Sequence, residues 1–432
     1  MSKMIRIYKD GDVSPDQIFY RSDDTSGIEK TVAAILSDVR ENGDAALFQY
    51  AKKFDGAELA ALEVTQEEFD AAEETADDAL VAIMQKAAAN IEAFHRNQVR
   101  QGFVVTQKNG VVLGQKITPL ARVGVYVPGG TASYPSSVLM NCIPAKLAGV
   151  GEIIVTTPAP SGVVSPNILA AARIAGADRV FKIGGAQAVG ALAYGTASVP
   201  RVDKIVGPGN AYVAEAKKQV FGTVAIDMIA GPSEILVIAD ASCRPAVVAA
   251  DMLSQAEHDK NASAVLVTDS PSLAEAVHVE LEKQLEALPR RAFAREAIDN
   301  NGKIIVTETL KRALEISNAL APEHLEICVD NPFDYLGMIQ NAGSIFLGKY
   351  CPEALGDYFA GPNHTLPTMG TARFSSPLSV DDFIKKSSFT YYTKTALEAV
   401  AQDVAAFAAR EGLDAHARSV TVRLQAERDV TP

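Results

Sequence analysis

Cysteine is scarce in this chain, and the four cysteines are never paired at short spacing. They stand far apart in the 432 residues, at Cys142, Cys243, Cys328 and Cys351. The lack of any Cys-x-x-Cys pair excludes a disulfide framework and a zinc ribbon. We therefore expect four core thiols in a protein of a reducing compartment.

Long apolar runs and an excess of positive charge are also missing. No uncharged apolar run approaches the roughly 18 residues that span a membrane, and residues 1–7 contain no secretory apolar region. The net charge of −13 argues against nucleic-acid binding, because phosphate contacts need clustered lysine and arginine. We expect a cytoplasmic protein whose partners include neither a nucleic acid nor a membrane.

A standard dinucleotide fingerprint, Gly-x-Gly-x-x-Gly with a following acidic residue, is absent as well. Glycine turns occur instead, at residues 128–130, 184–185, 207–210 and 231–233. Ligands of parallel α/β sheets collect at the carboxyl ends of the strands, which is where we expect all four turns. Each turn alone is more often a tight connection, but four of them together make a nucleotide a candidate ligand.

The composition, 48% hydrophobic and 22% charged, is typical of a soluble globular enzyme or binding protein. Residues 27–97 show helical periodicity. After Arg122, strand-like runs alternate with helical segments; the runs lie at 123–127, 153–157, 180–183, 202–206, 235–239, 264–267, 304–306, 325–329 and 344–347. This alternation predicts parallel sheets covered by helices on both faces.

Nine strands are many for one sheet, and a chain of this length predicts about two or three domains. We predict an α/β fold with two incomplete Rossmann-like parallel-sheet domains, a helical N-terminal region and an extended helical C-terminal tail. The strand signals end after Ser379 and helical pattern returns. The predicted parts are an arm at 1–25, a main domain at 26–125 plus 233–378, a second domain at 126–232 and a tail at 379–432.

Polar side chains gather at two places beside apolar runs. In the stretch 251–259, Gln255 and His258 would share one face of a helix because they are three residues apart. The group Pro322-Glu323-His324 precedes the run 325–329. Imidazoles beside acids suggest a metal site, a proton-transfer site, or both. The alternatives are that His258 satisfies carbonyls at a helix C-terminus and that the second group is a solvated turn.

Further candidates lie near the C-terminus. Asp357, in a segment punctuated by glycine and proline, is either a metal ligand or a loop carboxylate that caps backbone amides. Glu411 and His416 are five residues apart, so a common site needs a bend in the helix, and a solvated terminal helix is the alternative. Among the other histidines, His95 and His278 have helical, charged surroundings, and we expect both at the surface.

Six long motifs are distributed along the chain. The first three are Gly-Val-Tyr-Val-Pro-Gly-Gly-Thr at 124–131, Gly-Pro-Gly-Asn-Ala-Tyr-Val at 207–213 and Ile-Ala-Gly-Pro-Ser-Glu-Ile at 229–235. The others are Ser-Gln-Ala-Glu-His-Asp at 254–259, Ala-Pro-Glu-His-Leu at 321–325 and Glu-Gly-Leu-Asp-Ala-His at 411–416. Together these motifs resemble the histidinol dehydrogenase family, in the family's order and without a large insertion.

The resemblance implies a zinc-dependent, NAD-linked enzyme that oxidises L-histidinol to L-histidine through the bound aldehyde, the last step of histidine biosynthesis. The implied ligands of one Zn²⁺ per subunit are Gln255, His258, Asp357 and His416. The implied proton-transfer residues are Glu323 and His324. The implied substrate contacts are Ser233, His324, Glu411 and the four metal ligands. The implied cofactor contacts are Tyr126, Gln187 and Asn210.

The resemblance also implies a homodimer in which Glu411 and His416 complete the site of the partner subunit, which removes the need for a bent helix in one chain. In the implied chemistry His324 is the general base, and Glu323 activates the water that attacks the aldehyde. Cys142 could form a thiohemiacetal instead, but we interpret it as a core thiol.

Two other function classes compete with this interpretation. A zinc metallohydrolase could use Glu323 and His324 to activate water, but the glycine turns near Gln187 and Asn210 favour a dinucleotide partner. A non-catalytic binding protein gives no reason for paired bases beside a metal. An assay of NADH formation from histidinol separates the three.

Overall fold

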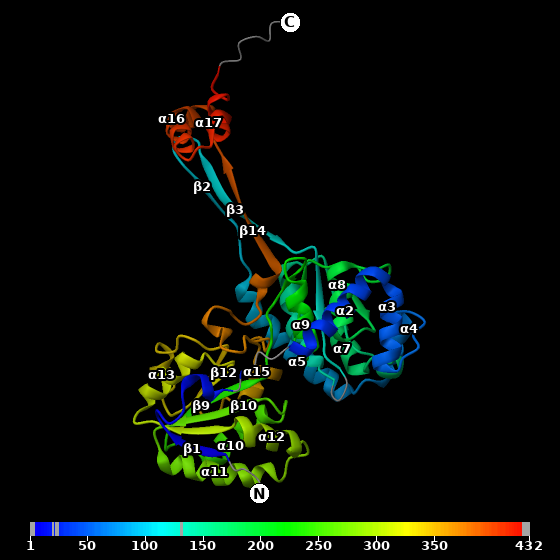
Figure 1. Cartoon of the computed structure of the whole chain (residues 1–432), viewed down its shortest axis with the longest axis vertical. Helices are drawn as coiled ribbons and strands as arrows, with labels where there is room; N and C mark the ends of the chain where they lie inside the picture. Colours follow the sequence, from blue (N-terminus) through cyan, green and yellow to red (C-terminus); the bar gives the residue numbers. More distant parts are fainter. Residues whose placement is uncertain (1–4, 20, 22–25, 130–132, 426–432) are drawn as a thin grey trace. The chain divides into compact units, whose positions relative to one another are not determined.

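The computed structural model divides the chain into two compact units (Figure 1). The first unit spans Met1–Val99 and Leu120–Phe383, and the second spans Arg100–Pro119 and Ile384–Pro432. The structure describes residues 5–19, 21, 26–129 and 133–425. No helix in these ranges is long and apolar enough to cross a membrane.

One parallel sheet of the first unit has six strands in the order β1-β11-β10-β9-β12-β13. The strands are β1 (Arg6–Lys9), β9 (Glu234–Ala239), β10 (Ser263–Thr268), β11 (Lys303–Val306), β12 (His324–Cys328) and β13 (Ser344–Leu347). The associated helices are α1 (Pro15–Ile18), α10 (Pro245–Ala256), α11 (Pro271–Leu285), α12 (Arg291–Asn301), α13 (Leu310–Leu320), α14 (Phe333–Leu336) and α15 (Glu353–Tyr358).

Both faces of this six-stranded sheet are buried, as its uninterrupted apolar strands predict. Ile235 and Val237 of β9 pack into a core with α10, α11 and α12. Leu236 and Ile238 point the other way, into a core with α1 and α13. Alternate residues of one strand therefore serve two cores, because successive side chains leave opposite faces of a sheet.

The other parallel sheet of the first unit has five strands in the order β6-β5-β4-β7-β8. The strands are β4 (Arg122–Tyr126), β5 (Glu152–Thr156), β6 (Arg179–Phe181), β7 (Lys204–Val206) and β8 (Ala225–Ile226). The helices that follow strands of this sheet are α6 (Pro135–Ala148), α7 (Pro166–Ala175), α8 (Gly185–Tyr194) and α9 (Ala211–Val220), with a 3₁₀ turn at Pro160–Gly162. Together the two parallel sheets contain all nine predicted strands, which confirms the α/β class.

The N-terminal helices pack on the five-stranded sheet, which differs from the predicted division of the chain. They are α2 (Ser26–Asn42), α3 (Asp44–Tyr50), a π-helix (Ala51–Asp55), α4 (Gln66–Thr75), α5 (Asp78–His95) and a 3₁₀ turn (Arg96–Gln98). Residues of α2 and α3 share a core with α8, and residues of α5 share one with α6 and α7. The prediction had joined 26–125 to the other sheet; helical periodicity identifies an apolar face but not its partner.

Two predicted boundaries also need correction in the first unit. The break placed between residues 125 and 126 falls inside β4, because Tyr126 pairs with Thr156 of β5. Within the predicted arm 1–25, Arg6–Lys9 pairs with β11 as an edge strand. The remaining short elements of this unit are two 3₁₀ turns at Thr371–Arg373 and Val380–Phe383.

The second unit contains an antiparallel sheet in the order β14-β3-β2. Its elements are β2 (Phe103–Thr106), β3 (Val112–Pro119), β14 (Ile384–Tyr391), α16 (Lys394–Arg410) and α17 (Asp414–Thr421). The prediction that strand signals end after Ser379 was wrong, because β14 is a strand of eight residues. All of β14 except Ile384 is exposed, so no buried face marks it in the sequence.

The cysteines are free thiols, as expected. Cys142, Cys243 and Cys328 are buried, whereas Cys351 is only half-buried. Burial raises the pKa of the Cys142 thiol far above its ordinary value. Cys142 therefore fits the predicted core thiol rather than a nucleophile.

Candidate functional site

Helix α10 and strand β12 bring the two polar motifs of the sequence together. His324 is the first residue of β12 and pairs with Ile235 of β9. Gln255 lies in the last turn of α10, and its Nε2 is 2.7 Å from Nδ1 of His324. Both side chains are buried, with exposed fractions of 1% for Gln255 and 4% for His324.

The surroundings of Gln255 determine how its amide is oriented. Nε2 lies 3.2 Å from Oε2 of Glu353 and 3.5 Å from the backbone oxygen of Glu234, in addition to His324. Because two of these neighbours are acceptors only, the amide nitrogen faces them and the amide oxygen does not. Oε1 of Gln255 and Nε2 of His324 are left buried without a hydrogen-bond partner. An electrophile such as a metal ion would satisfy both atoms.

A cluster of possible metal ligands lies in the same region. One ligand atom from each of His258, Glu353 and Asp357 lies within 4.8 Å of the others. His258 is exposed just beyond α10, where its backbone N–H donates to the carbonyl of Gln255. Backbone groups rather than the imidazole satisfy this helix end, so the ring is available for a ligand. Oδ1 of Asp357 is 3.9 Å from Nε2 of His324.

Glu353 is a site residue that the sequence analysis missed. Its carboxylate accepts hydrogen bonds from Ser254 Oγ at 3.1 Å and from Gln255 Nε2 at 3.2 Å. Burial raises the pKa of Glu353 to about 8, although the nearby His324 opposes this shift. The only signal in the sequence is an acidic residue after Pro352 at the start of α15, which is typical of ordinary helix ends.

Glu323 is held beside His324 by the backbone of the neighbouring strand. Its Oε2 accepts a hydrogen bond of 2.8 Å from the backbone N–H of Glu234 and lies 3.6 Å from Nδ1 of His324. Burial alone would lower the pKa of His324, but the carboxylates of Glu323, Glu353 and Asp357 outweigh it and raise that pKa well above its usual value.

The site lies at the amino ends of its strands, which corrects one expectation. Ser233 directly precedes β9, and Glu323 directly precedes β12. The glycine turn at 231–233 was expected at the carboxyl end of a strand, but it enters β9 instead. Ser233 is half-buried, and its carbonyl accepts a hydrogen bond from Ser263 N–H at 3.0 Å.

The three predicted cofactor contacts lie on the five-stranded sheet, after the carboxyl ends of its strands. Tyr126 ends β4, Gln187 lies in the first turn of α8 after β6, and Asn210 caps α9 after β7. The Tyr126 hydroxyl accepts a hydrogen bond of 3.1 Å from Gly185 N–H, and burial raises the pKa of this phenol to about 12. This edge is where dinucleotides bind in such sheets.

A cavity of about 210 Å³ opens beside the same strand ends. Its lining residues include Pro128 and Gly129 after β4, and Thr157 and Pro158 after β5. The described part of the first glycine turn therefore borders a hollow, as a ligand-binding turn should. Gly130 of this turn lies outside the described residues.

Glu411 and His416 belong to the second unit. Glu411 caps the C-terminus of α16 and His416 lies in α17, and both side chains are exposed. Gly412, with a φ of +76°, turns the chain between the two helices. The two residues therefore do not lie on one straight helix.

The remaining histidines fall into three different environments. The expectation that His95 lies at the surface was wrong: the side chain is fully buried, and Nδ1 lies 2.7 Å from Gln98 Oε1. His278 is half-buried and lies 3.0 Å from the carbonyl of Ile5. His364 donates from Nδ1 to the carbonyl of Asp357 at 3.0 Å, so it supports that candidate ligand. Burial lowers the pKa of His364.

Comparisons with known proteins agree over almost the whole chain. The model of the histidinol dehydrogenase family matches residues 20–424. The chain is 53% identical over 431 residues to histidinol dehydrogenase of Clostridium acetobutylicum, covering 98% of this chain and 100% of that protein. The protein of the same name from Syntrophotalea carbinolica is 57% identical over 401 residues, covering 92% and 93%. The crystal structure of histidinol dehydrogenase from Elizabethkingia anophelis is similar with a TM-score of 0.93 at 38% identity, covering 99% and 100%.

Proposed function

Because the chain belongs to the histidinol dehydrogenase family and is thus an oxidoreductase, we propose that it oxidises L-histidinol to L-histidine. The reaction removes four electrons in two steps, passes through bound L-histidinaldehyde, uses NAD and Zn²⁺, and completes histidine biosynthesis. One observation carries this proposal: Gln255 Oε1 and His324 Nε2 are buried without partners beside the ligand cluster of His258, Glu353 and Asp357. The imidazole of His324, a candidate base, thus lies next to a candidate metal site.

The donor set of this region suits zinc. Gln255, His258 and Asp357 offer an amide oxygen, an imidazole and a carboxylate, and His416 of a second subunit would add another imidazole. Such an oxygen- and nitrogen-rich set leaves positions open, as catalytic zinc sites do. When bound, the ion would act as a Lewis acid that binds and orients histidinol.

The residues around the site have distinct tasks in the two steps. His324 takes the hydroxyl proton at Nε2, because its Nδ1 is already engaged with Gln255 and the Glu234 carbonyl. Glu323 activates the water that attacks the aldehyde, and the buried Glu234 N–H fixes its carboxylate for that role. Ser233 and, from a second subunit, Glu411 contact the substrate. Each base contributes on the order of 10²–10⁴-fold to the rate.

We assign NAD to the carboxyl edge of the five-stranded sheet. Tyr126, Gln187 and Asn210 lie there, beside the cavity lined by Pro128 and Gly129. NAD bound there would supply the hydride acceptor for both oxidation steps. The N-terminus of α9, capped by Asn210, is suited to a phosphate group because helix amides point toward it.

The test of this function is the yield of NADH from zinc-loaded protein supplied with L-histidinol and NAD. Two NADH per histidinol are expected, and activity should disappear with a chelator and return with Zn²⁺. A complete lack of NADH would exclude the dehydrogenase. Hydrolytic activity without NADH would favour the alternative, a zinc metallohydrolase that uses Glu323 and His324.

Homodimers that exchange their tails form a separate part of the proposal. Chains carrying His416→Ala and chains carrying Glu323→Ala should each be inactive alone, and they are mixed by unfolding and refolding. If the tails cross, each hybrid dimer contains one site with both residues intact and activity returns. Hybrid dimers that remain inactive would contradict the exchange.

A further inference from the structure

A second group of metal-binding side chains lies on the same two elements as Gln255 and His324. Asp251 precedes Gln255 by one turn of α10, so both side chains lie on one face of the helix. Glu326 and Cys328 follow His324 at alternate positions of β12 and therefore share its face of the strand. One ligand atom from each of Asp251, Glu326 and Cys328 lies within 4.8 Å of the others.

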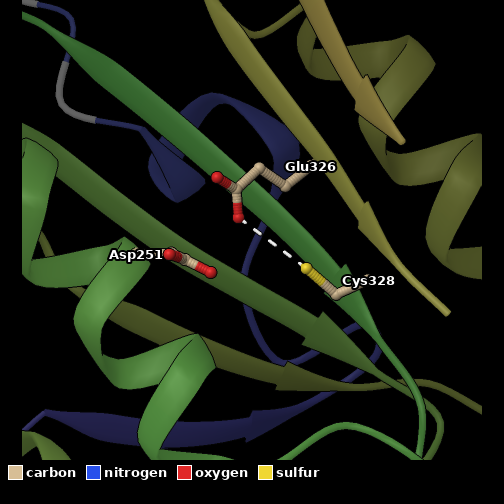
Figure 2. A group of neighbouring side chains, drawn as sticks. All are labelled: Asp251, Glu326 and Cys328. Atoms are coloured by element: carbon tan, nitrogen blue, oxygen red, sulfur yellow. Dashed lines mark hydrogen bonds between the residues drawn. The ribbon is translucent and has the colours of Figure 1, made fainter. Parts of the chain in front are cut away.

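Figure 2 shows these three side chains converging from the helix and the strand. All three are buried, with exposed fractions of 8% for Asp251, 0% for Glu326 and 2% for Cys328. The Cys328 thiol donates to Oε2 of Glu326 at 3.8 Å. Within the described residues, the two carboxyl groups interact with each other and not with a basic side chain.

Two buried carboxyl groups at this distance need a positive charge or a shared proton. Burial raises the pKa of Asp251 to about 6 and, together with the charge of Asp251, raises that of Glu326 well above its usual value. The backbone N–H of Glu353 donates to Oε1 of Glu326 at 2.8 Å, which satisfies only part of the acceptor capacity. A divalent cation would compensate both acids at once.

A candidate for a fourth ligand and a cavity both lie beside these three side chains. Cys243, in the turn after β9, is buried next to Cys328, but its thiol does not belong to the group of three and would have to move toward the ion. A cavity of about 270 Å³ is lined by Asp251, Cys328 and Lys349, among others. The Lys349 ammonium is occupied by Asp330 Oδ1 at 2.6 Å and the carbonyl of Ser242 at 3.0 Å.

We infer that Asp251, Glu326 and Cys328, with Cys243 as the fourth ligand, bind a thiophilic divalent cation such as Zn²⁺. Two carboxylates and two thiolates make a four-coordinate set of the kind that zinc accepts. Ligand atoms of tetrahedral zinc lie roughly 3.3–3.8 Å apart, so the three atoms within 4.8 Å have to close slightly around the ion. The protons of the two thiols and of the carboxyl pair pass to solvent on binding.

This ion would be separate from the one held by Gln255 and His258. It would lock α10 to β12 one helical turn away from the Gln255–His324 contact. Its role is structural, because it fixes the two elements that carry the catalytic residues. The inference goes beyond the proposed function and stands without it, since none of these four ligands takes part in the proposed reaction.

Cobalt spectroscopy distinguishes the two sites. The metal-free protein is titrated with Co²⁺, and a thiolate-to-cobalt charge-transfer band in the near ultraviolet is expected. The catalytic ligand set contains no sulfur, so only the Asp251 cluster can produce that band. Cys328→Ser should abolish it and reduce the bound metal by one ion per chain, while Cys142→Ser, a buried thiol elsewhere, should leave both unchanged.

Wild-type protein without the band, or a band that survives Cys328→Ser, would overturn the inference. Loss of the band on Cys351→Ser alone would do the same, since that thiol also borders the cavity. Glu326→Gln is the second variant, in case Cys328→Ser does not fold. It retains both thiols and should weaken Co²⁺ binding at least tenfold; an unchanged affinity would contradict the assignment.

Discussion

Nε2 of Gln255 lies 2.7 Å from Nδ1 of His324, and this contact joins the last turn of α10 to the first residue of β12. One residue belongs to the predicted metal site and the other to the predicted proton-transfer site. The contact therefore merges two motifs 69 residues apart into one centre. It also leaves the amide oxygen and the second ring nitrogen available, which is the arrangement that a metal-assisted dehydrogenation needs.

Glu353 should control zinc binding through Gln255. Glu353→Gln replaces the carboxyl group that accepts the hydrogen bond from the amide nitrogen of Gln255, and the dissociation constant for zinc should rise by about 10–100-fold. A zinc titration of the metal-free protein, followed by recovery of NADH formation, measures this change. Asp259→Asn is the control, because its carboxylate accepts from the backbone of Asn261 instead. Equal effects of both variants would contradict the prediction.

Glu323→Gln should separate the two half-reactions. Aldehyde oxidation should slow by about 10²–10⁴-fold, because the amide cannot activate water, whereas alcohol oxidation keeps its base, His324. Rapid-mixing experiments should then show one fast NADH per site in place of two. His324→Gln should slow both steps. Equal losses in both half-reactions for Glu323→Gln would count against the assigned role.

The ion pair between Arg21 and Glu234 should be essential for stability. The guanidinium donates to the Glu234 carboxylate at 2.7 and 2.9 Å, and only 1% of that side chain is exposed. Arg21→Ala leaves a buried carboxylate without its partner and should cost about 3 kcal/mol of unfolding free energy in urea titrations. Arg21→Lys should cost less. Lys52→Ala, which breaks an exposed ion pair with Glu58, should have no measurable effect.

Gly207 should tolerate no side chain. Its φ is +109°, and an added Cβ would collide with the backbone oxygen of Tyr126. Gly222 has a φ of +96° but nothing within 4 Å of an added Cβ. Gly222→Ala should therefore cost about 1–2 kcal/mol from backbone strain, and Gly207→Ala about 1–3 kcal/mol more. The free energies of unfolding of the two variants and their KM for NAD test this prediction. Equal losses of stability in both variants would contradict the collision expected at Gly207.

His95 should make the protein sensitive to acid. Burial lowers the pKa of His95, although the hydrogen bond with Gln98 opposes the shift. Because the folded pKa lies below the unfolded value of about 6.5, its contribution to stability is complete above that pH and is lost as pH falls. Denaturation midpoints between about pH 5 and 8 should fall less steeply with acid in His95→Gln than in the wild type.

The sequence predicted those parts of the fold in which the order of apolar and polar residues reveals which side chains are buried. All nine predicted strands exist because strands covered on both faces are continuously apolar, as in β9. Strand β14 was not predicted because its residues from Lys385 to Tyr391 are exposed and therefore show no apolar run. Helix α2 was recognised from its periodicity, but its packing against α8 could not be inferred from one amphipathic face.

In the candidate site, too, residues with a local sequence signal were predicted and residues defined by tertiary contacts were not. Gln255, His258, Glu323, His324 and Asp357 were all selected from the sequence by residue type, spacing and family resemblance. Glu353 was not, because its importance depends on contacts with Gln255 and Ser254 that fold formation creates. His95 was misplaced for the same reason: charged neighbours along a helix do not reveal which face a core will cover.

By itself the sequence determined the α/β class, the strands, the family and most candidate residues, since apolar runs and long motifs are local properties. Only the tertiary structure decided that the Glu323–His324 pair stands at the amino end of β12, within hydrogen-bonding distance of α10. It alone decided that Asp251, Glu326 and Cys328 converge one turn further along. Such convergence depends on strand order and on helix packing over tens of residues, and no local pattern records these long-range contacts.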